Sequence, residues 1–395
     1  MPDIARIQNE IKAAGADGWL LYDFHNRDEI AYHVLGLDFG KFTSRRWFYW
    51  IPVAGEPVRL VSKVESSKLD ALPGVKRPYL SWRELHAALK ETLGSARKVA
   101  MQYSPMANIP YVSNVDGGTI DLIRSLGFEV VSSAGLVQTF EAVLDDAAYR
   151  SHVEAGERVQ RIKDEAFALL GSELRAGRTL TQYDLQQFIV RRFGEEGLDC
   201  MGEYPIVGSD EQQADPHFEP RPDNSRPFRK GDRVLIDLWA KLAQPGAIFY
   251  DITWCGFVGA QPPARYVEIF NIVRDARDAA LAFIRERYAA GRELYGWEVD
   301  DACRAVVAKA GYGDFFIHRT GHSIGEHVHG NGVNIDNLET KDERLLVPGI
   351  CFSIEPGIYL AGEMAVRSEI NVFITPSGSV EVAGAMQRDL VLVDV

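Results

Sequence analysis

Residues 233–258 read RVLIDLWAKLAQPGAIFYDITWCGFV. Two apolar runs flank a Pro-Gly pair, a combination typical of a turn, so this stretch predicts a β-hairpin. One aspartate interrupts the centre of each run, Asp237 in the first and Asp251 in the second. With a five-residue loop from Leu242 to Gly246, antiparallel pairing would set the two aspartates directly opposite each other. Facing Cβ atoms in such a pair are about 4.5–5.5 Å apart.

Two further acids interrupt apolar extended segments nearer the C-terminus. Glu355 lies in CFSIEPGIYL, residues 351–360, and Glu369 lies in AVRSEINVFI, residues 365–374. Two like charges 4 Å apart repel by about 4 kcal/mol at an effective dielectric constant near 20, and four clustered acids multiply that repulsion. If the four acids meet, either several are protonated or cations neutralise them. Two divalent ions would balance four carboxylates.

Histidines are concentrated in residues 315–330, FFIHRTGHSIGEHVHG. Four of the nine histidines fall there: His318, His322, His327 and His329. Imidazole is a common metal ligand and proton shuttle, so this density indicates chemistry rather than packing. One neutral imidazole added to four carboxylates makes an oxygen-rich ligand set, which suits Mn, Co, Zn or Fe better than a thiolate-type site does.

The order Asp, Asp, His, Glu, Glu, with TGHSIG, SIEPGIYL and VRSEI around the last three, resembles the pita-bread metallopeptidases. The resemblance is greatest to Xaa-Pro dipeptidases (prolidases) and aminopeptidase P. It extends over the whole chain, weakly through residues 1–150 and specifically from about 200 to 375. It implies an α+β fold of two domains. These are a small α/β N-terminal domain of the creatinase/prolidase type, residues 1–150, and a pita-bread catalytic domain, residues 151–395.

The same resemblance implies a metal site of five ligands. Asp237 would chelate one ion, Asp251 and Glu369 would bridge two, and His322 and Glu355 would complete the site. The cofactors would be two divalent metal ions, with Mn, Co and Zn as the candidates.

Further residues match positions that the family uses in catalysis and substrate binding. Glu355 would accept the proton of the attacking water. His217, His318, His329 and Arg367 would contact the substrate, and the three histidines would assist catalysis. The implied enzyme is a cytoplasmic, homodimeric dipeptidase that hydrolyses the bond before a proline in second position through a metal-bridged hydroxide. The alternative is an aminopeptidase P that acts on longer peptides.

Three departures from the family pattern bear on substrate selectivity rather than on the metal set. The spacing from Asp237 to Asp251 is about three residues longer than usual, so the hairpin turn is extended. Trp254 stands where the family often has arginine. Glu326 and His327 replace a more usual hydrophobic-acidic pair.

Two other classes of function stay open on the sequence. Residues 321–325, GHSIG, satisfy the G-x-S-x-G pattern of serine hydrolases, with Ser323 as nucleophile. That motif should lead into a helix, with the acid and then the histidine following the serine. Here no helix-forming run follows, and no histidine lies beyond His329, which disfavours the pattern. A non-catalytic binding module is the other alternative, disfavoured because all five ligand positions are filled.

Composition limits the range of partners. A chain of 395 residues favours two domains. Its net charge of −13 disfavours nucleic acid as a partner. The four cysteines lie about 50 residues apart, a spacing that suits neither a zinc site nor a disulfide scaffold. No uncharged run reaches 18 residues and no signal peptide is recognisable, so we expect a cytosolic protein without a membrane span.

Patterning predicts individual elements as well. In the N-terminal domain we expect a helix at Ile4–Ala14 and five strands. A helical segment should follow over 140–174, and two helices, at 266–290 and 297–310, should interrupt the extended segments of the C-terminal domain. The expected strands are Trp19–Tyr22, Trp47–Val53, Val58–Val61, Val99–Tyr103 and Glu129–Ser132.

Overall fold

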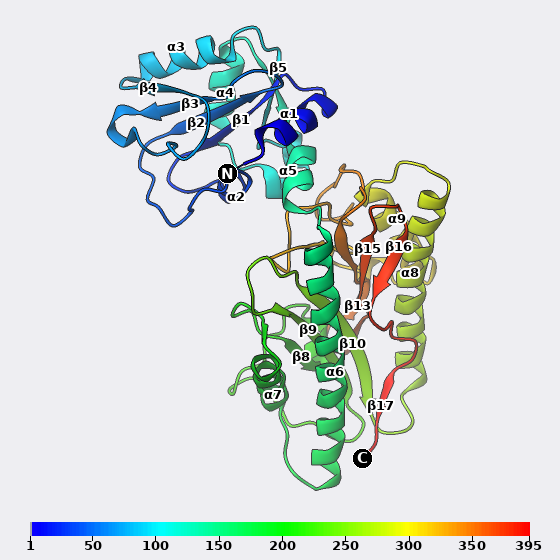
Figure 1. Ribbon diagram of the computed structural model, residues 1–395. Coiled ribbons are helices and arrows are strands. Elements are labelled where there is room, and N and C mark those ends of the chain that lie inside the picture. Colours follow the sequence, from blue (N-terminus) through cyan, green and yellow to red (C-terminus); the bar gives the residue numbers. More distant parts are fainter. Residues whose placement is uncertain (1) are drawn as a thin grey trace. The chain divides into compact units, whose positions relative to one another are not determined.

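The computed structural model describes residues 2–395 and divides into two compact units, Met1–Glu141 and Ala142–Val395 (Figure 1). Each unit encloses hydrophobic cores of its own. The mixture of helices and sheets is the α+β architecture that the sequence predicts.

The N-terminal unit is built on a six-stranded mixed sheet of order β4-β3-β2-β1-β5-β6. Its central strand β1 pairs antiparallel with β2 and parallel with β5. The strands are β1 (Gly18–Asp23), β2 (Trp47–Pro52), β3 (Val58–Ser62), β4 (Val75–Tyr79), β5 (Lys98–Met101) and β6 (Glu129–Ser132). The helices are α1 (Ile4–Ala13), α2 (Glu29–Leu35), α3 (Trp82–Leu93), α4 (Gly117–Ser125) and α5 (Ala134–Glu141). Three short 3-10 turns are η1 (Lys63–Glu65), η2 (Pro105–Ala107) and η3 (Pro110–Val112).

Helices cover both faces of this sheet because successive strand residues point to opposite faces. Trp19 and Leu21 pack in one core with α1, α2 and α5. Leu20 and Tyr22 pack in the other core with α3 and α4. Figure 1 shows the two helical layers on either side of the strands. Strands buried on both faces read as continuous apolar runs, which is why they could be found in the sequence.

The predicted helix and five strands of this unit are confirmed to within three residues at each end. The sixth strand, β4, was not predicted. Its sequence VKRPY carries two cations and a proline, and it forms the edge of the sheet. Edge strands often carry charge and proline, so they lack the apolar pattern by which strands are recognised.

The C-terminal unit contains two larger sheets and a two-stranded ribbon. The first sheet has the order β17-β10-β9-β7, with β8 also paired to β9, and the second has the order β11-β12-β15-β16. The strands are β7 (Leu198–Asp199), β8 (Ile206–Ser209), β9 (Arg233–Leu242), β10 (Tyr250–Val258), β11 (Ser323–Ile324), β12 (Cys351–Ile354), β13 (Gly357–Leu360), β14 (Met364–Arg367), β15 (Ile370–Ile374), β16 (Val380–Ala383) and β17 (Val391–Val393). The helices are α6 (Asp146–Arg175), α7 (Gln182–Glu195), α8 (Ala264–Ala289) and α9 (Gly296–Lys309), with 3-10 turns η4 (Asp210–Ala214) and η5 (Gly313–Phe315).

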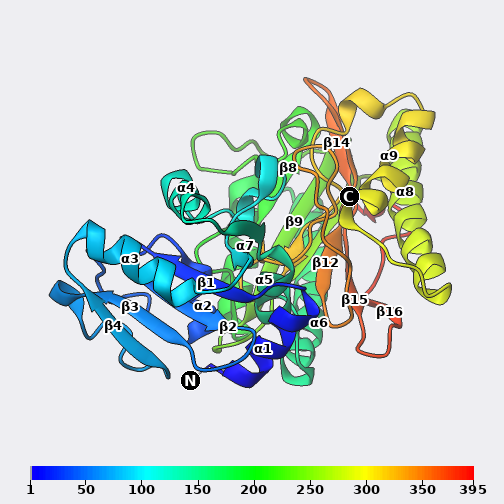
Figure 2. The same cartoon turned by 90° about the horizontal axis from the view of Figure 1, so that it is seen from above.

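Two pairs of helices enclose these strands. Helices α6 and α7 lie on one side and α8 and α9 on the other (Figure 2). Strand β10 faces both layers: Ile252 and Val258 belong to the core with α6, whereas Cys255 and Phe257 belong to the core with α8 and α9. The odd-numbered residues of β10, which include Asp251, therefore point away from α6.

The hairpin register differs from the prediction by two residues. Asp237 lies opposite Thr253, and Asp251 lies opposite Trp239. The apolar residues after the turn are the cause, because they do not join the ladder: the Ile248 N–H donates to Ser151 Oγ and the Phe249 N–H donates to Gly325 O, both at 3.0 Å. A shift of two preserves the alternation of strand residues, so both aspartates keep the same face.

Within residues 2–395, the structure has no helix both long enough and apolar enough to span a bilayer.

Candidate active site

Two of the five predicted ligands lie within strands, and the other three lie directly beside strand ends. Asp237 and Asp251 lie within β9 and β10. Glu355 directly follows β12, Glu369 directly precedes β15, and His322 directly precedes β11. Strands β11, β12 and β15 are neighbours in one sheet, so the last three side chains are brought together by that pairing.

Gly321 lets the histidine segment approach β12 closely. A Cβ atom at position 321 would lie 2.0 Å from the carbonyl oxygen of Ser353, so any larger residue would push the two segments apart. The His322 N–H donates to Ser353 Oγ at 3.0 Å. The glycine of the TGH sequence is thus needed for close packing next to the candidate ligand His322.

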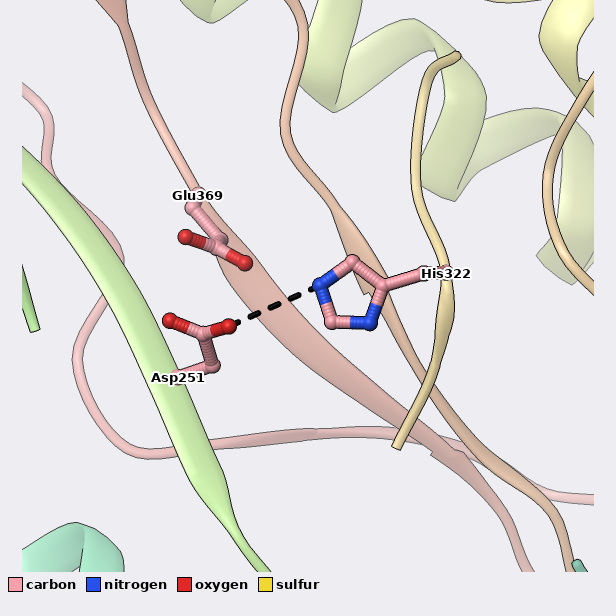
Figure 3. Close-up of side chains that lie close together, drawn as sticks. All are labelled: Asp251, His322 and Glu369. Carbon is pink, nitrogen blue, oxygen red and sulfur yellow. Dashed lines mark ion pairs between the residues drawn. The ribbon is translucent and has the colours of Figure 1, made fainter. Parts of the chain in front are cut away.

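Asp251, His322 and Glu369 form the centre of the site. Each offers one ligand atom, and these atoms lie within 4.8 Å of one another (Figure 3). Nε2 of His322 is 3.5 Å from Asp251 Oδ2 and 3.4 Å from Glu355 Oε1. Its other ring nitrogen, Nδ1, is 3.0 Å from the carbonyl oxygen of Ser323. A proton on Nδ1 satisfies that contact and leaves the Nε2 lone pair facing the carboxylates, as in a metal-bound histidine.

Two oxygens of this centre have no partner. Across the described residues, neither Asp251 Oδ1 nor Glu369 Oε1 has a hydrogen-bond donor, although both atoms are buried. Burying a carboxylate oxygen without a partner is costly, and buried charges are normally paired or bound to metal. Divalent cations would satisfy both oxygens. The residues present therefore fit a metal centre with oxygen ligands and one imidazole.

Asp237 is held differently from the other acids. Thr253 Oγ1 lies 2.9 Å from Asp237 Oδ1, and the Arg367 guanidinium is ion-paired with Oδ2. Thr253 Oγ1 also lies 3.0 Å from Glu369 Oε2 and accepts a 2.9 Å hydrogen bond from Arg367 Nε. Asp237 thus lies beside the other ligands with both oxygens already engaged. Its role as a metal ligand stays a prediction.

Burial dominates the electrostatics of the acids. It raises the pKa of Asp237 to about 7, although Arg367 opposes the shift. Burial, reinforced by neighbouring carboxylates, also raises the pKa of Asp251 and holds that of Glu369 well above its usual value. Burial opposes ionisation of Glu355 too, but nearby cationic groups, His322 foremost, hold its pKa below the usual value. Without cations, burial and the neighbouring carboxylates therefore oppose full ionisation of Asp237, Asp251 and Glu369.

The five predicted ligands line a single pocket of about 420 Å³. His217, His329 and Arg367 line it too, and their contact with substrate stays a prediction. The remaining lining residues are Glu203, Ile206, Pro216, Trp239 and Val328.

Two histidines of the sequence cluster lie outside that lining. His318 Nδ1 lies 2.6 Å from the carbonyl oxygen of Arg319, and its Nε2 lies 2.9 Å from the Tyr359 hydroxyl. Tyr359 in turn accepts a hydrogen bond from Arg367 at 3.2 Å. His318 therefore connects to the pocket through Tyr359 and Arg367, and its contact with substrate stays a prediction. His327 is exposed.

Sequence reasoning missed Thr253 and Tyr359, which connect the acids to Arg367 and His318. Thr253 could have been found, because it lies two residues after Asp251 and strand residues two apart share a face. Tyr359 carries no such signal, because its contacts depend on how the β13–β14 ribbon approaches the site.

Trp254 does not line the pocket that contains the predicted ligands. It lies on the face of β10 opposite Asp251 and Thr253, and Lys163 of α6 places its ammonium nitrogen 3.4 Å from the ring centre. The departure from the family pattern at this position is thus a packing feature.

The serine-nucleophile alternative lacks the required geometry. Ser323 is 1% exposed, and its hydroxyl accepts the Gly332 N–H at 3.0 Å. No histidine ring in the described part of the chain hydrogen-bonds to that hydroxyl. A two-residue strand, not a helix, contains the serine. Ser323 is therefore a structural residue.

Comparison with known proteins agrees with this geometry. A family described as metallopeptidase family M24 matches residues 154–376. The probable dipeptidase PepE of Mycobacterium tuberculosis is 30% identical over 276 residues, which cover 70% of this chain and 67% of that protein. The Xaa-Pro dipeptidase of Pyrococcus furiosus is 28% identical over 319 residues, which cover 80% of this chain and 79% of that protein.

A solved structure matches the fold over nearly the whole length. The dipeptidase PepE of Mycobacterium ulcerans superposes with a TM-score of 0.71 at 23% identity, covering 99% of this chain and 97% of that one. The two-domain pita-bread architecture predicted from the sequence is thus confirmed. The protein is a metallopeptidase, and the chain belongs to metallopeptidase family M24.

Proposed function

We propose that the enzyme is a Xaa-Pro dipeptidase with two divalent metal ions. The observation that carries the proposal is the set of five converging ligands, in which Asp251 Oδ1 and Glu369 Oε1 are buried without partners. The relative from Pyrococcus furiosus, named a Xaa-Pro dipeptidase, supports proline in the second position of the substrate.

Asp251 and Glu369 would bridge the two ions, and each has one oxygen free for that purpose. His322 and Glu355 would complete one side of the site. Asp237 would complete the other side once its carboxylate is shared between Arg367 and a cation. Mn, Co and Zn each accept such a mixture of carboxylates with one imidazole.

When bound, such ions supply a hydroxide at neutral pH from water and polarise the scissile carbonyl. Glu355 would take the proton that the water loses, because its depressed pKa keeps it ionised. The proline nitrogen carries no hydrogen and must gain a proton to leave, so Glu355 would return that proton to it. His217 and His329 line the pocket and would hydrogen-bond to the tetrahedral intermediate.

The experiment uses three peptides in parallel: Ala-Pro, Ala-Pro-Ala and Ala-Ala. The protein is stripped with EDTA and then assayed with Mn, Co or Zn. Rapid hydrolysis of Ala-Pro alone supports the proposal. Comparable hydrolysis of Ala-Ala would show a dipeptidase without proline specificity.

The aminopeptidase alternative is decided by the same assay, because it predicts faster release of alanine from Ala-Pro-Ala than from Ala-Pro. A binding module would leave all three peptides intact and would contain no metal after purification. A homodimer, expected from the family resemblance, is tested by sedimentation of the purified protein.

A further inference from the structure

The catalytic pocket continues into a second hollow of about 580 Å³. Glu203, Val328 and His329 line both, so the two form one cleft. The second hollow, here called the side groove, adds Met201, Phe249 and His327 to its walls. Its two sides are the segment between β7 and β8 and the segment that follows β11.

The side groove has an apolar part, formed by Met201, Phe249 and Val328, beside the polar side chains of Glu203, His327 and His329. Phe249 and Val328 are buried and pack in one cluster, while Met201 is 50% exposed. This apolar part matches an aliphatic chain of several carbons better than a compact polar group.

At the junction of the pocket and the side groove stands an unpaired carboxylate. Glu203 is exposed, and no Lys, Arg or His of the described chain lies within ion-pair distance of it. Most acids in the neighbouring segments do have partners, among them Asp210, which pairs with Arg226 and Arg233. Lys241 lies beside the groove, with its ammonium nitrogen 5.2 Å from the centre of the Phe249 ring, but it donates to the carbonyl oxygen of Glu326 at 2.7 Å and forms no ion pair with Glu203. The carboxylate of Glu203 is therefore available to a ligand.

We propose that the side groove binds a lysine or arginine side chain of the peptide substrate. Its aliphatic stem would lie along Met201, Phe249 and Val328, and its cationic head would meet Glu203. Lysine and arginine combine an apolar stem with a charged end, and this cleft offers the complementary combination. The inference rests on the proposed peptidase function, which supplies the peptide in the adjoining pocket.

The test compares Lys-Pro with norleucyl-Pro, which has the same aliphatic stem but no charge. Both are assayed for hydrolysis by the metal-loaded enzyme. Their ketomethylene analogues, which cannot be cleaved, are titrated by calorimetry. We expect the lysyl compounds to be favoured about two- to fivefold in KM and Kd, because a partly exposed ion pair contributes about that much.

Two variants assign the preference to Glu203. Glu203→Gln should remove the lysyl preference, measured as the ratio of the values for the lysyl and norleucyl compounds, and Glu203→Lys should favour a glutamyl analogue instead. Glu286→Gln, a change at an exposed residue of α8, should keep the preference. A lysyl preference that survives in Glu203→Gln, or no preference in the parent enzyme, overturns the inference.

The calorimetric arm separates this inference from the proposed function. If the analogues bind with a Glu203-dependent preference but Lys-Pro is not cleaved, the peptidase assignment fails and the side-groove site stands. If both peptides are cleaved equally well and the analogues bind equally, the peptidase assignment stands and the side-groove site fails. A uniform loss of affinity for both analogues in Glu203→Gln would show that Glu203 binds the common α-amino group, which also overturns the side-chain assignment.

Discussion

Thr253 faces Asp237 across the β9–β10 ladder, with Oγ1 2.9 Å from Asp237 Oδ1. The same hydroxyl lies 3.0 Å from Glu369 Oε2 and accepts a hydrogen bond from Arg367. A side chain without metal-ligand chemistry thus holds two predicted ligands and the cation beside them. Groups that orient metal ligands are usually worth about ten- to a hundredfold in metal affinity.

Replacing Thr253 should therefore weaken metal binding without displacing the fold. Thr253→Val keeps the shape and removes the hydroxyl, and we expect Mn²⁺ affinity to fall by about tenfold or more. Isothermal titration of the EDTA-stripped protein measures the change. Thr253→Ser keeps the hydroxyl and should stay within about threefold of the parent. Equal affinity in the valine variant would show that the hydroxyl does not orient the ligands.

Removing Asp251 or Glu369 should weaken metal binding more than removing the Thr253 hydroxyl does. Asp251→Ala and Glu369→Ala should each abolish both turnover and metal uptake, because these side chains offer the free oxygens at the centre of the site. Metal content by mass spectrometry and hydrolysis of Ala-Pro check the two effects. Asp389→Ala, a change of an acid outside the pocket, serves as the matched control. A near-normal rate in the Asp251 variant would refute the site assignment.

The metal-free protein should become less stable as the pH rises from 6.5 to 8. Asp237, with a pKa of about 7, and Asp251, Glu369 and His322, with raised pKa values, hold more protons when folded than when unfolded. Their contribution to stability is present at low pH and is lost as the pH rises through the folded pKa values. Asp28 of the N-terminal unit, with a pKa raised by burial to about 7, acts in the same direction.

The pH window matters because three histidines act in the opposite direction below it. His152, His318 and His329 have pKa values lowered to between about 3 and 4, so they favour unfolding only below about pH 6.5. Thermal midpoints of the EDTA-treated protein at pH 6.5 and 8 measure the effect. Added Mn²⁺ should prevent most of the fall in thermal midpoint between pH 6.5 and 8, but not the part of that fall that is due to Asp28. A thermal midpoint that rises between pH 6.5 and 8 in the metal-free protein would contradict the raised pKa values of the buried acids.

The sequence predicts the metal centre better than it predicts the contacts around it. Acids that interrupt apolar strands, such as Asp237 and Asp251, are visible because a buried charge departs from the pattern. The register of their hairpin was wrong by two residues, because Ile248 and Phe249 look like strand residues but bond to other segments. The side groove could not be predicted, because its lining comes from three segments that are far apart in sequence, around Met201, Phe249 and Val328.

Trp254 offers a test of the packing assigned to β10. Trp254→Leu removes the ring that lies against the Lys163 ammonium, so the thermal midpoint should fall by several degrees, the equivalent of about 1–3 kcal/mol. Because the ring faces α6, KM and kcat for Ala-Pro should stay within about twofold of the parent. Differential scanning calorimetry and steady-state kinetics separate the two effects. A change in peptide preference would place Trp254 back in substrate selection.

His329 should act on the substrate as a neutral ring rather than as an acid. In the metal-free protein the positive charge of the neighbouring His322, whose ring centre lies 4.4 Å away, lowers the pKa of His329 to about 3, and burial acts in the same direction. When His322 is a neutral metal ligand, the bound dications would take the place of that charge and would also keep His329 neutral. His329→Ala should keep its metal but lower kcat by about a hundredfold, the usual cost of one donor to a developing oxyanion. His329→Gln retains an N–H donor and should recover part of the rate. Because the ring stays neutral, the fall in rate should be the same at pH 6 and pH 8. A loss confined to the acidic side would show instead that an imidazolium at this position protonates the leaving proline.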